Sequence, residues 1–122
     1  MVGGPSVRSL SVSFDGSGSS PAAGTLYRMY VPAPCTIQSA TMVSDVSGSA
    51  VVDIWVASYP TIPTIANTIV ASDKPTLSSA QASQDASLTG WTVTIPGNSN
   101  VFFHLDSAST LTIFTLTLVV VG

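Results

Sequence analysis

The stretch Val51–Val56 reads VVDIWV, the composition of a buried β-strand interrupted by a single carboxylate. β-Branched and aromatic side chains suit the pleated surface of a strand. Because successive side chains point to opposite faces, Val52 and Ile54 share a face that suits a core, whereas Asp53 and Trp55 share the other. We therefore expect Asp53 at a sheet surface or a subunit contact, where it accepts hydrogen bonds from hydroxyl groups or from an arginine of a neighbour.

The same alternation recurs on both sides of this stretch, between clusters of Ser, Thr, Gly and Pro that are typical of turns. Leu10 and Phe14 fall on one face of a segment whose other face is serine, which predicts a half-buried strand. Further along, the pattern assigns Cys35, Ile37 and Val43 to one face. Strands are expected at residues 7–14, 25–31, 35–43, 51–57, 91–95, 100–106 and 110–121.

Four stretches depart from simple alternation. DVSGS at 45–49 predicts a turn, and TIANTIV at 64–70 is compatible with a short strand or one helical turn. SSAQASQ at 78–84 has a helix-like pattern with few apolar anchors. In the last segment the apolar set shifts from the parity of Leu111 to that of Phe114, which predicts a β-bulge or a strand buried on both faces.

Seven or eight short strands without a long helix predict an all-β fold, an antiparallel β-sandwich. The chain of 122 residues is the size of one domain, so we assign residues 1–122 to a single sandwich. The spaced Cys, Trp and Cys of an immunoglobulin domain are absent from the sequence. We therefore expect a jelly-roll-like order of strands.

The composition is unusually poor in charge. Charged residues make up 7% of the chain, there is no Glu, and the only basic residues are Arg8, Arg28 and Lys74. Without a basic cluster, nucleic-acid binding is not expected, and no apolar run is long enough to span a membrane. Few charges also leave strand edges unguarded, so we expect partner subunits to cover much of the hydroxyl-rich surface in an obligate oligomer.

The residues available for chemistry are few. His104 is the only imidazole and Cys35 the only thiol, and no nucleotide-binding, zinc-protease or paired-cysteine motif occurs. We expect no enzyme activity, cofactor or metal. Cys35 is expected to behave as a small buried hydrophobe, and Trp91 as a core anchor. Asp15–Gly24 has one carboxylate among its serines and glycines, which favours a surface loop over a calcium site.

A binding role has three candidate residues. Asp53, Trp55 and Tyr59 could contact a sugar if their face of the strand were exposed, because such sites combine aromatic rings with carboxylate and amide groups. The alternative is that Trp55 fills a space between sheets or subunits, as large aromatic side chains commonly do.

The order of several short motifs resembles a small β-domain that recurs in virion proteins of tailed bacteriophages. These motifs are VVDIW at 51–55, KPTLSSAQ at 74–81, LTGW at 88–91 and DSAST at 106–110. They lie within a resemblance that extends from Pro34 to Val121. The resemblance implies a structural or adhesion module of a phage particle, assembled as a homotrimer.

Two roles follow from this resemblance. The one we expect is a capsid decoration (cement) protein that binds the major capsid protein, because no long trimeric fibre shaft precedes the match. Residues 1–9 would then be an N-terminal arm on a neighbouring subunit or the shell. The alternative is a tail fibre or tail-tip module whose loops at 15–24 and 59–67 contact a host-surface glycan. No signal peptide is evident, so we expect synthesis in the host cytoplasm and a final location in the virion.

Overall fold

The computed structural model describes residues 6–122, which form seven antiparallel strands and one 3-10 helix. The fold is the expected all-β, jelly-roll-like sandwich. No helix among the described residues has the length and apolar character needed to cross a bilayer. The elements are β1 (Val7–Asp15), β2 (Leu26–Val31), β3 (Cys35–Ser58), η1 (Ile65–Asn67), β4 (Thr76–Asp85), β5 (Thr94–Ile95), β6 (Ser99–Ser109) and β7 (Ile113–Val121).

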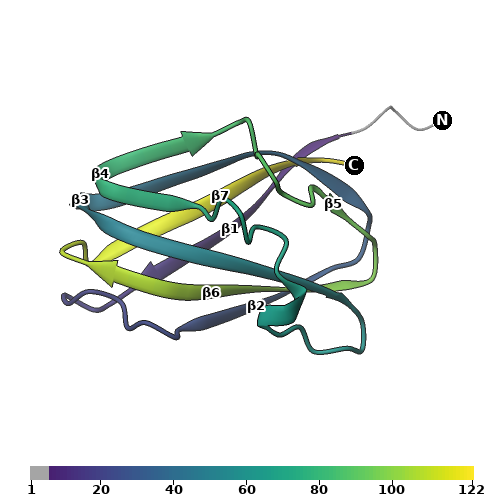
Figure 1. Ribbon diagram of the computed structural model, residues 1–122, viewed down its shortest axis with the longest axis horizontal. Helices are drawn as coiled ribbons and strands as arrows, with labels where there is room; N and C mark the ends of the chain where they lie inside the picture. The colour runs from purple at the N-terminus through teal and green to yellow at the C-terminus, as the bar shows by residue number, and fades with distance from the viewer. Residues whose placement is uncertain (1–5) are drawn as a thin grey trace.

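Three long segments of chain run side by side and bend at the same end of the molecule. They are β1 with β2, β3, and β6 with β7. β6 and β7 follow one another antiparallel to β3, with β6 paired to residues 49–58 and β7 to residues 36–44. β1 pairs with β7 and β2 with β6 in the same way. The three segments are interrupted or bent at residues 16–25, 45–48 and 110–112. The ribbon therefore folds over into two packed layers, with this bend at the left of Figure 1.

We call the layer of β1, β7 and residues 36–44 the first layer, and that of β2, β6 and residues 49–58 the second layer. β4 pairs with β3 across the bend, and β5 pairs with the start of β3. Apolar side chains from both layers fill the space between them, and Phe14 and Phe114 stack there with ring centroids 5.0 Å apart. Alternate side chains of each strand are thus in this core, as the sequence pattern predicts for a sandwich.

β3 differs from the expected strand, turn and strand. Residues 45–49 are not a turn between strands but the bent middle of one strand of 24 residues. The face assignment of Val43 was wrong as well, because the register with β7 shifts between Ile37 and Ser39. The extra residue, Gln38, exchanges the faces, so that Ala40 and Met42 are buried and Val43 is 51% exposed.

Other elements also differ from expectation. The segment 78–84 is not helical but belongs to β4, because pairing with β3 outweighs its weak local preference. Of the expected strand 91–95, only Thr94–Ile95 is regular strand. The shift of apolar parity near the C-terminus is no bulge within β7. Leu111 lies in the loop before β7, after Thr110 with its positive φ of 73°, and is nevertheless fully buried.

Two single-residue predictions are confirmed. Cys35 is a buried free thiol, and burial raises its pKa. Trp91 lies in the core cluster, and its Nε1 donates a hydrogen bond of 2.6 Å to the carbonyl oxygen of Asp73.

The N-terminal arm expected at residues 1–9 is shorter than predicted. Residues 7–9 belong to β1, with Val7 opposite Val121, and residues 1–5 lie outside the described part of the chain.

Asp45 joins the bend of β3 to the start of β7. Its carboxylate accepts hydrogen bonds from the side chain and backbone N–H of Thr112, at 2.6 and 3.1 Å, and from the backbone N–H of Ile113. The hydrogen bond from the Thr112 side chain is the main cause that lowers the Asp45 pKa to about 2. These partners of Asp45 lie on another segment, at the start of β7.

This depressed pKa predicts a contribution to acid stability. A carboxyl whose pKa is lower in the folded state stabilises the fold above its unfolded pKa of about 3.9, and this contribution is lost as the pH falls towards about 2. Asp45→Asn is expected to be less stable than the parent near neutral pH and to lose less stability on acidification. Urea unfolding midpoints at about pH 6 and about pH 2.5 test this, and equal losses in the two proteins would contradict it.

Candidate functional site

The outer face of the second layer carries the residues singled out from the sequence. Val52 and Ile54 point into the core and are fully buried, whereas Asp53 and Trp55 point outward, as the alternation predicts. The expected exposure of Asp53 was wrong, since only 1% of the residue is accessible. Residues 68–75 run along this edge of β3 and cover it, with the N–H of Ile69 bonded to the carbonyl oxygen of Ile54 at 2.9 Å.

Asp53 is satisfied inside the chain rather than by a neighbour. Its Oδ1 accepts hydrogen bonds from the Thr68 hydroxyl at 2.5 Å and from the backbone N–H of Ile54 at 2.9 Å. Its Oδ2 lies 3.6 Å from the Lys74 ammonium. A buried carboxylate needs such partners because removal from water is costly. Asp53 therefore attaches the covering segment to the sheet.

Lys74 extends this contact into a network with Asp106 and His104. The Lys74 ammonium lies 2.7 Å from Asp106 Oδ2, and His104 Nδ1 lies 2.7 Å from Asp106 Oδ1. The hydrogen bond to Asp106 is the main cause of the raised Lys74 pKa. Burial raises the Asp106 pKa, but the bonds from Lys74 and His104 outweigh it and the pKa is lowered. We call Asp53, Lys74, Asp106 and His104 the ionic network.

The register of β6 places this network. His104 lies directly opposite Asp53, and the pairing of β3 with β6 shifts at Asp106, between Leu105 and Ser107. This bulge turns Asp106 towards the ammonium group of Lys74. The Asp106 carboxylate thus joins Lys74, which lies on another segment, to His104 of its own strand. The His104 ring also stacks on Trp55, with centroids 4.9 Å apart.

Trp55 and Tyr59 have different surroundings. Trp55 is half-buried, and its Nε1 is the one buried side-chain polar atom of residues 6–122 without a hydrogen-bond partner. Tyr59 lies beyond the end of β3, is 59% exposed and meets Tyr30 edge to face, with centroids 6.1 Å apart. The structure thus brings Asp53 close to Trp55 but separates Tyr59 from them.

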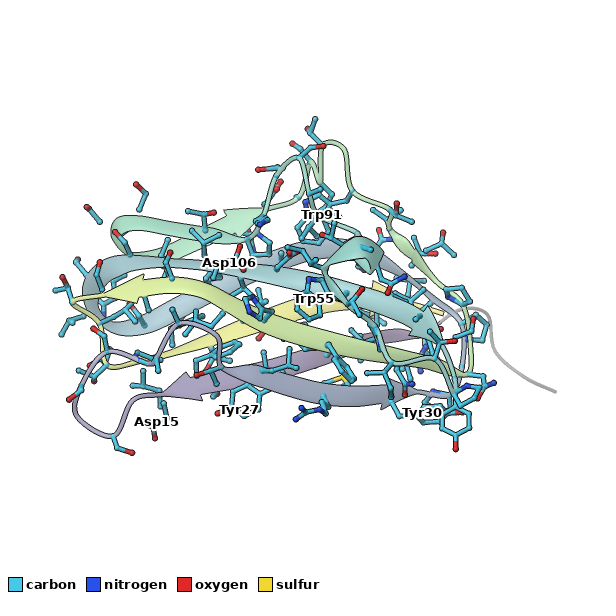
Figure 2. The ribbon with its side chains drawn as sticks, turned by 60° about the horizontal axis from the view of Figure 1, so that its bottom comes forward. Asp15, Tyr27, Tyr30, Trp55, Trp91 and Asp106 are labelled. Carbon is cyan, nitrogen blue, oxygen red and sulfur yellow. The ribbon has the colours of Figure 1, made fainter. Side chains whose placement is uncertain are left out.

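Tyr59 instead belongs to a groove that the sequence reasoning missed. Two adjacent hollows there have volumes of about 230 and 340 Å³. Arg28 and Tyr30 are two residues apart in a strand and therefore share a face, which is the signal that the sequence offers, but pairing of β2 with β6 is needed to bring them to Tyr59. Figure 2 shows Tyr30 at the end of the molecule away from Asp15. The residues of this tyrosine groove are Arg28, Met29, Tyr30, Tyr59, Ile62, Asn98, Asn100 and Phe102.

The outer face of the first layer, together with the neighbouring part of β4, has a different character. Register places Ser11, Thr117, Thr41 and Gln84 in one row across four strands. Their side chains bond to one another, with Ser11 to Thr117 at 3.0 Å and Gln84 to Thr41 at 3.0 Å. Across the rows from Ser9 to Ser13 no side chain is ionisable, and Asp15 follows beyond them on the same side of β1. We call these rows the uncharged face; they consist of Ser9, Ser11, Ser13, Ser39, Thr41, Val43, Ala82, Gln84, Thr115, Thr117 and Val119.

A further hollow lies beside β4 and contains Asp73 and Asp85. A hydrogen bond with the Asp85 side chain raises the Asp73 pKa, whereas the backbone N–H of Leu88 is the main cause that lowers the Asp85 pKa. Within residues 6–122 no group of three His, Cys, Asp or Glu side chains is placed to hold a metal ion. The hollow offers two carboxyl groups that interact with each other.

No protein-family model matches this chain, and no curated protein matches it. Among solved structures, it is similar to a chain in the "Structure of infectious bursal disease virus Gx strain", with 12% identity and a TM-score of 0.48. The similarity covers 96% of this chain and 32% of that chain, so this chain spans about a third of the other's length. At this level of similarity the comparison assigns the chain neither to a family nor to a role.

Proposed function

We propose that this chain is a structural protein of a bacteriophage virion, and specifically a decoration protein that binds the capsid surface as a homotrimer. The uncharged face is the observation that carries this proposal. The resemblance of the motif order to phage virion domains supports the bacteriophage virion as the assembly. In this proposal the partners are further copies of the chain and the major capsid protein, and neither nucleic acid nor a membrane is bound.

The uncharged face suits a protein contact for a physical reason. The centres of protein interfaces are depleted of charged residues, because each ion must lose its water. In the central rows, the hydroxyl and amide groups of Ser11, Thr41 and Gln84 already have partners within the chain, which reduces the cost of covering them. Small side chains also leave the face even, so that a second surface can lie close against it.

The edge strand β1 supports an oligomer as well. Its outward side chains are Val7, Ser9, Ser11, Ser13 and Asp15, so its middle is uncharged, and Arg8 is its single basic residue. Natural sheets guard exposed edges with charge, Pro or bulges to prevent pairing with other chains. An edge with so little protection fits a strand that a neighbouring subunit covers. Repetition of weak contacts around a trimer and over a shell would then give strong attachment.

Replacing Thr117 by Lys tests this function. The substitution places an ammonium group at the centre of the uncharged face, and we expect binding to emptied capsids to weaken at least about tenfold, or about 1.4 kcal/mol. Thr89→Lys is the matched control, because Thr89 is exposed in a loop away from this face. Cosedimentation with capsids and sedimentation velocity of the free protein give the readouts. Undiminished binding by a folded Thr117→Lys protein contradicts the proposal.

A second candidate function has its own observation, the tyrosine groove. Exposed aromatic rings at one end of the molecule favour a tail fibre or tail-tip module that contacts a host surface. Binding of fluorescently labelled protein distinguishes the two functions. A decoration protein attaches to emptied capsids and ignores host cells, whereas a receptor-binding module does the reverse. In both functions the chain acts by binding and has no enzymatic activity.

A further inference from the structure

We propose that the tyrosine groove binds a carbohydrate unit that carries a carboxylate, as uronic and sialic acids do. This inference goes beyond the proposed function, since a sugar site can operate on a capsid surface or on a tail. It rests on three properties of the groove: exposed aromatic rings, amide groups held in place, and a guanidinium group without a carboxylate partner among the described residues.

The two tyrosines provide an apolar platform. Tyr30 is 50% exposed and Tyr59 is 59% exposed, and their rings are inclined by 80° to one another. One ring thus presents its edge to the other, and the pair forms a corner rather than a flat stack. The face of an aromatic ring packs well against the C–H groups of a pyranose. The hydroxyl groups at the edge of the sugar ring then remain free to form hydrogen bonds. Ile62, also exposed, extends the apolar side of this corner.

The amide groups of the groove have fixed orientations. The Tyr30 hydroxyl donates to Asn98 Oδ1 at 2.6 Å, which directs the Asn98 amide so that its NH₂ group stays available as a donor. Asn100 Nδ2 donates to the carbonyl oxygen of Thr61 at 3.0 Å, which leaves its Oδ1 available as an acceptor. A donor and an acceptor held close to an aromatic corner match the hydroxyl groups of a sugar.

Arg28 sets the charge of the ligand. Its guanidinium carbon lies over the Phe102 ring, 5.5 Å from the ring centre, within the range of a cation–π contact. Within residues 6–122 it forms no ion pair, whereas Lys74 is engaged by two aspartates. No acidic residue lines the groove. A guanidinium group binds a carboxylate through two parallel hydrogen bonds, so charge complementarity favours an acidic sugar over a neutral one.

The size of the groove favours a small ligand over a protein. Its two hollows, of about 230 and 340 Å³, lie at or below the lower end of the range of roughly 300–1,000 Å³ found for small-molecule sites. A stable protein interface covers roughly 800 Å² of each partner and is comparatively flat. The corner between two tyrosine rings is instead suited to one or two sugar units.

A titration with matched sugars tests the site. Methyl glucuronide and methyl glucoside differ only in the carboxylate, and the methyl glycoside of N-acetylneuraminic acid is a second acidic probe. We expect saturable shifts in the NMR signals of the Arg28 guanidinium and the Asn98 side-chain amide with at least one acidic probe. The affinity for the neutral glucoside should be at least about tenfold lower.

Variants separate the contributions of charge and ring. Arg28→Gln should reduce the affinity for the acidic probe to that for the glucoside, and Tyr59→Ala should weaken binding of both sugars. Arg8→Gln is the control, because it removes a cation elsewhere in the chain. Absence of saturable shifts with all three probes, or an acid preference that survives Arg28→Gln, overturns the inference. Capsid binding by Arg28→Gln should equal that of the parent, so this outcome is distinct from failure of the decoration function.

Discussion

Replacing Lys74 by Met is expected to lower the free energy of unfolding by about 3 kcal/mol, the lower end of the range for breaking a buried ion pair. The methionine keeps the length of the side chain but removes the charge. Asp53, with 1% exposure, then keeps only its two hydrogen bonds from Thr68 and Ile54, and Asp106 loses its 2.7 Å partner. The lower end applies because 29% of the Lys74 side chain is accessible. Urea unfolding near neutral pH measures the loss.

Two further variants show whether the loss arises from the unpaired carboxylate. Lys74→Arg keeps the positive charge and should retain most of the stability. Combining Lys74→Met with Asp53→Asn removes both charges of the buried pair, and the double variant should be more stable than the sum of the two single losses predicts. If Lys74→Met lies within about 0.5 kcal/mol of the parent, the ionic network does not stabilise the fold.

Local alternation was sufficient to predict the inner faces of several strands. Leu10 and Phe14 in β1, and Val52 and Ile54 in β3, lie on the sides that the pattern indicates. The reason is that a sandwich buries one face of each strand, so the period of two is preserved wherever the strand is regular. The class of fold can be predicted because many segments show this alternation. The prediction does not require the order of the strands in the sheet.

The pattern was insufficient where an extra residue enters a strand. Gln38 shifts the register of β3, and from that point the outward position of Val43 cannot be read from its spacing to Cys35. The stretch DVSGS has the composition of a turn, yet the chain continues through it as a strand. Pairing with β4 and β6 on either side holds it there. Local sequence does not specify these pairings.

The site was predicted only in part, because its residues come together over long distances in sequence. Trp55 and Asp53 share a face, as expected, but the burial of Asp53 depends on Thr68 and Lys74, which lie on a segment without a clear pattern of its own. Tyr59 was a candidate, whereas its partner Tyr30 was not. Their contact depends on the alignment of β2, β6 and β3, which only the folded chain provides.

Gly48 occupies the bend of β3, where the two layers meet. A Cβ atom at this position would lie 2.7 Å from the backbone nitrogen of Leu111 and 2.7 Å from the carbonyl oxygen of Ser109. Both contacts are closer than carbon atoms can approach without movement, and both involve backbone of the β6–β7 connection. Glycine is thus required here by close approach of two chain segments, and not by an unusual φ angle.

Gly48→Ala is accordingly expected to lower the free energy of unfolding by about 3 kcal/mol, at the upper end for overpacking of a core. The methyl group must displace the connection that carries the fully buried Leu111, and backbone cannot yield as a flexible side chain does. Ser47→Ala is the control, because the neighbouring Ser47 is exposed and should change stability by less than about 0.5 kcal/mol. Urea unfolding compares the two. Equal stability of both variants would mean that the layers can separate at this bend without cost. The fold would then not depend on the close contact between β3 and the β6–β7 connection.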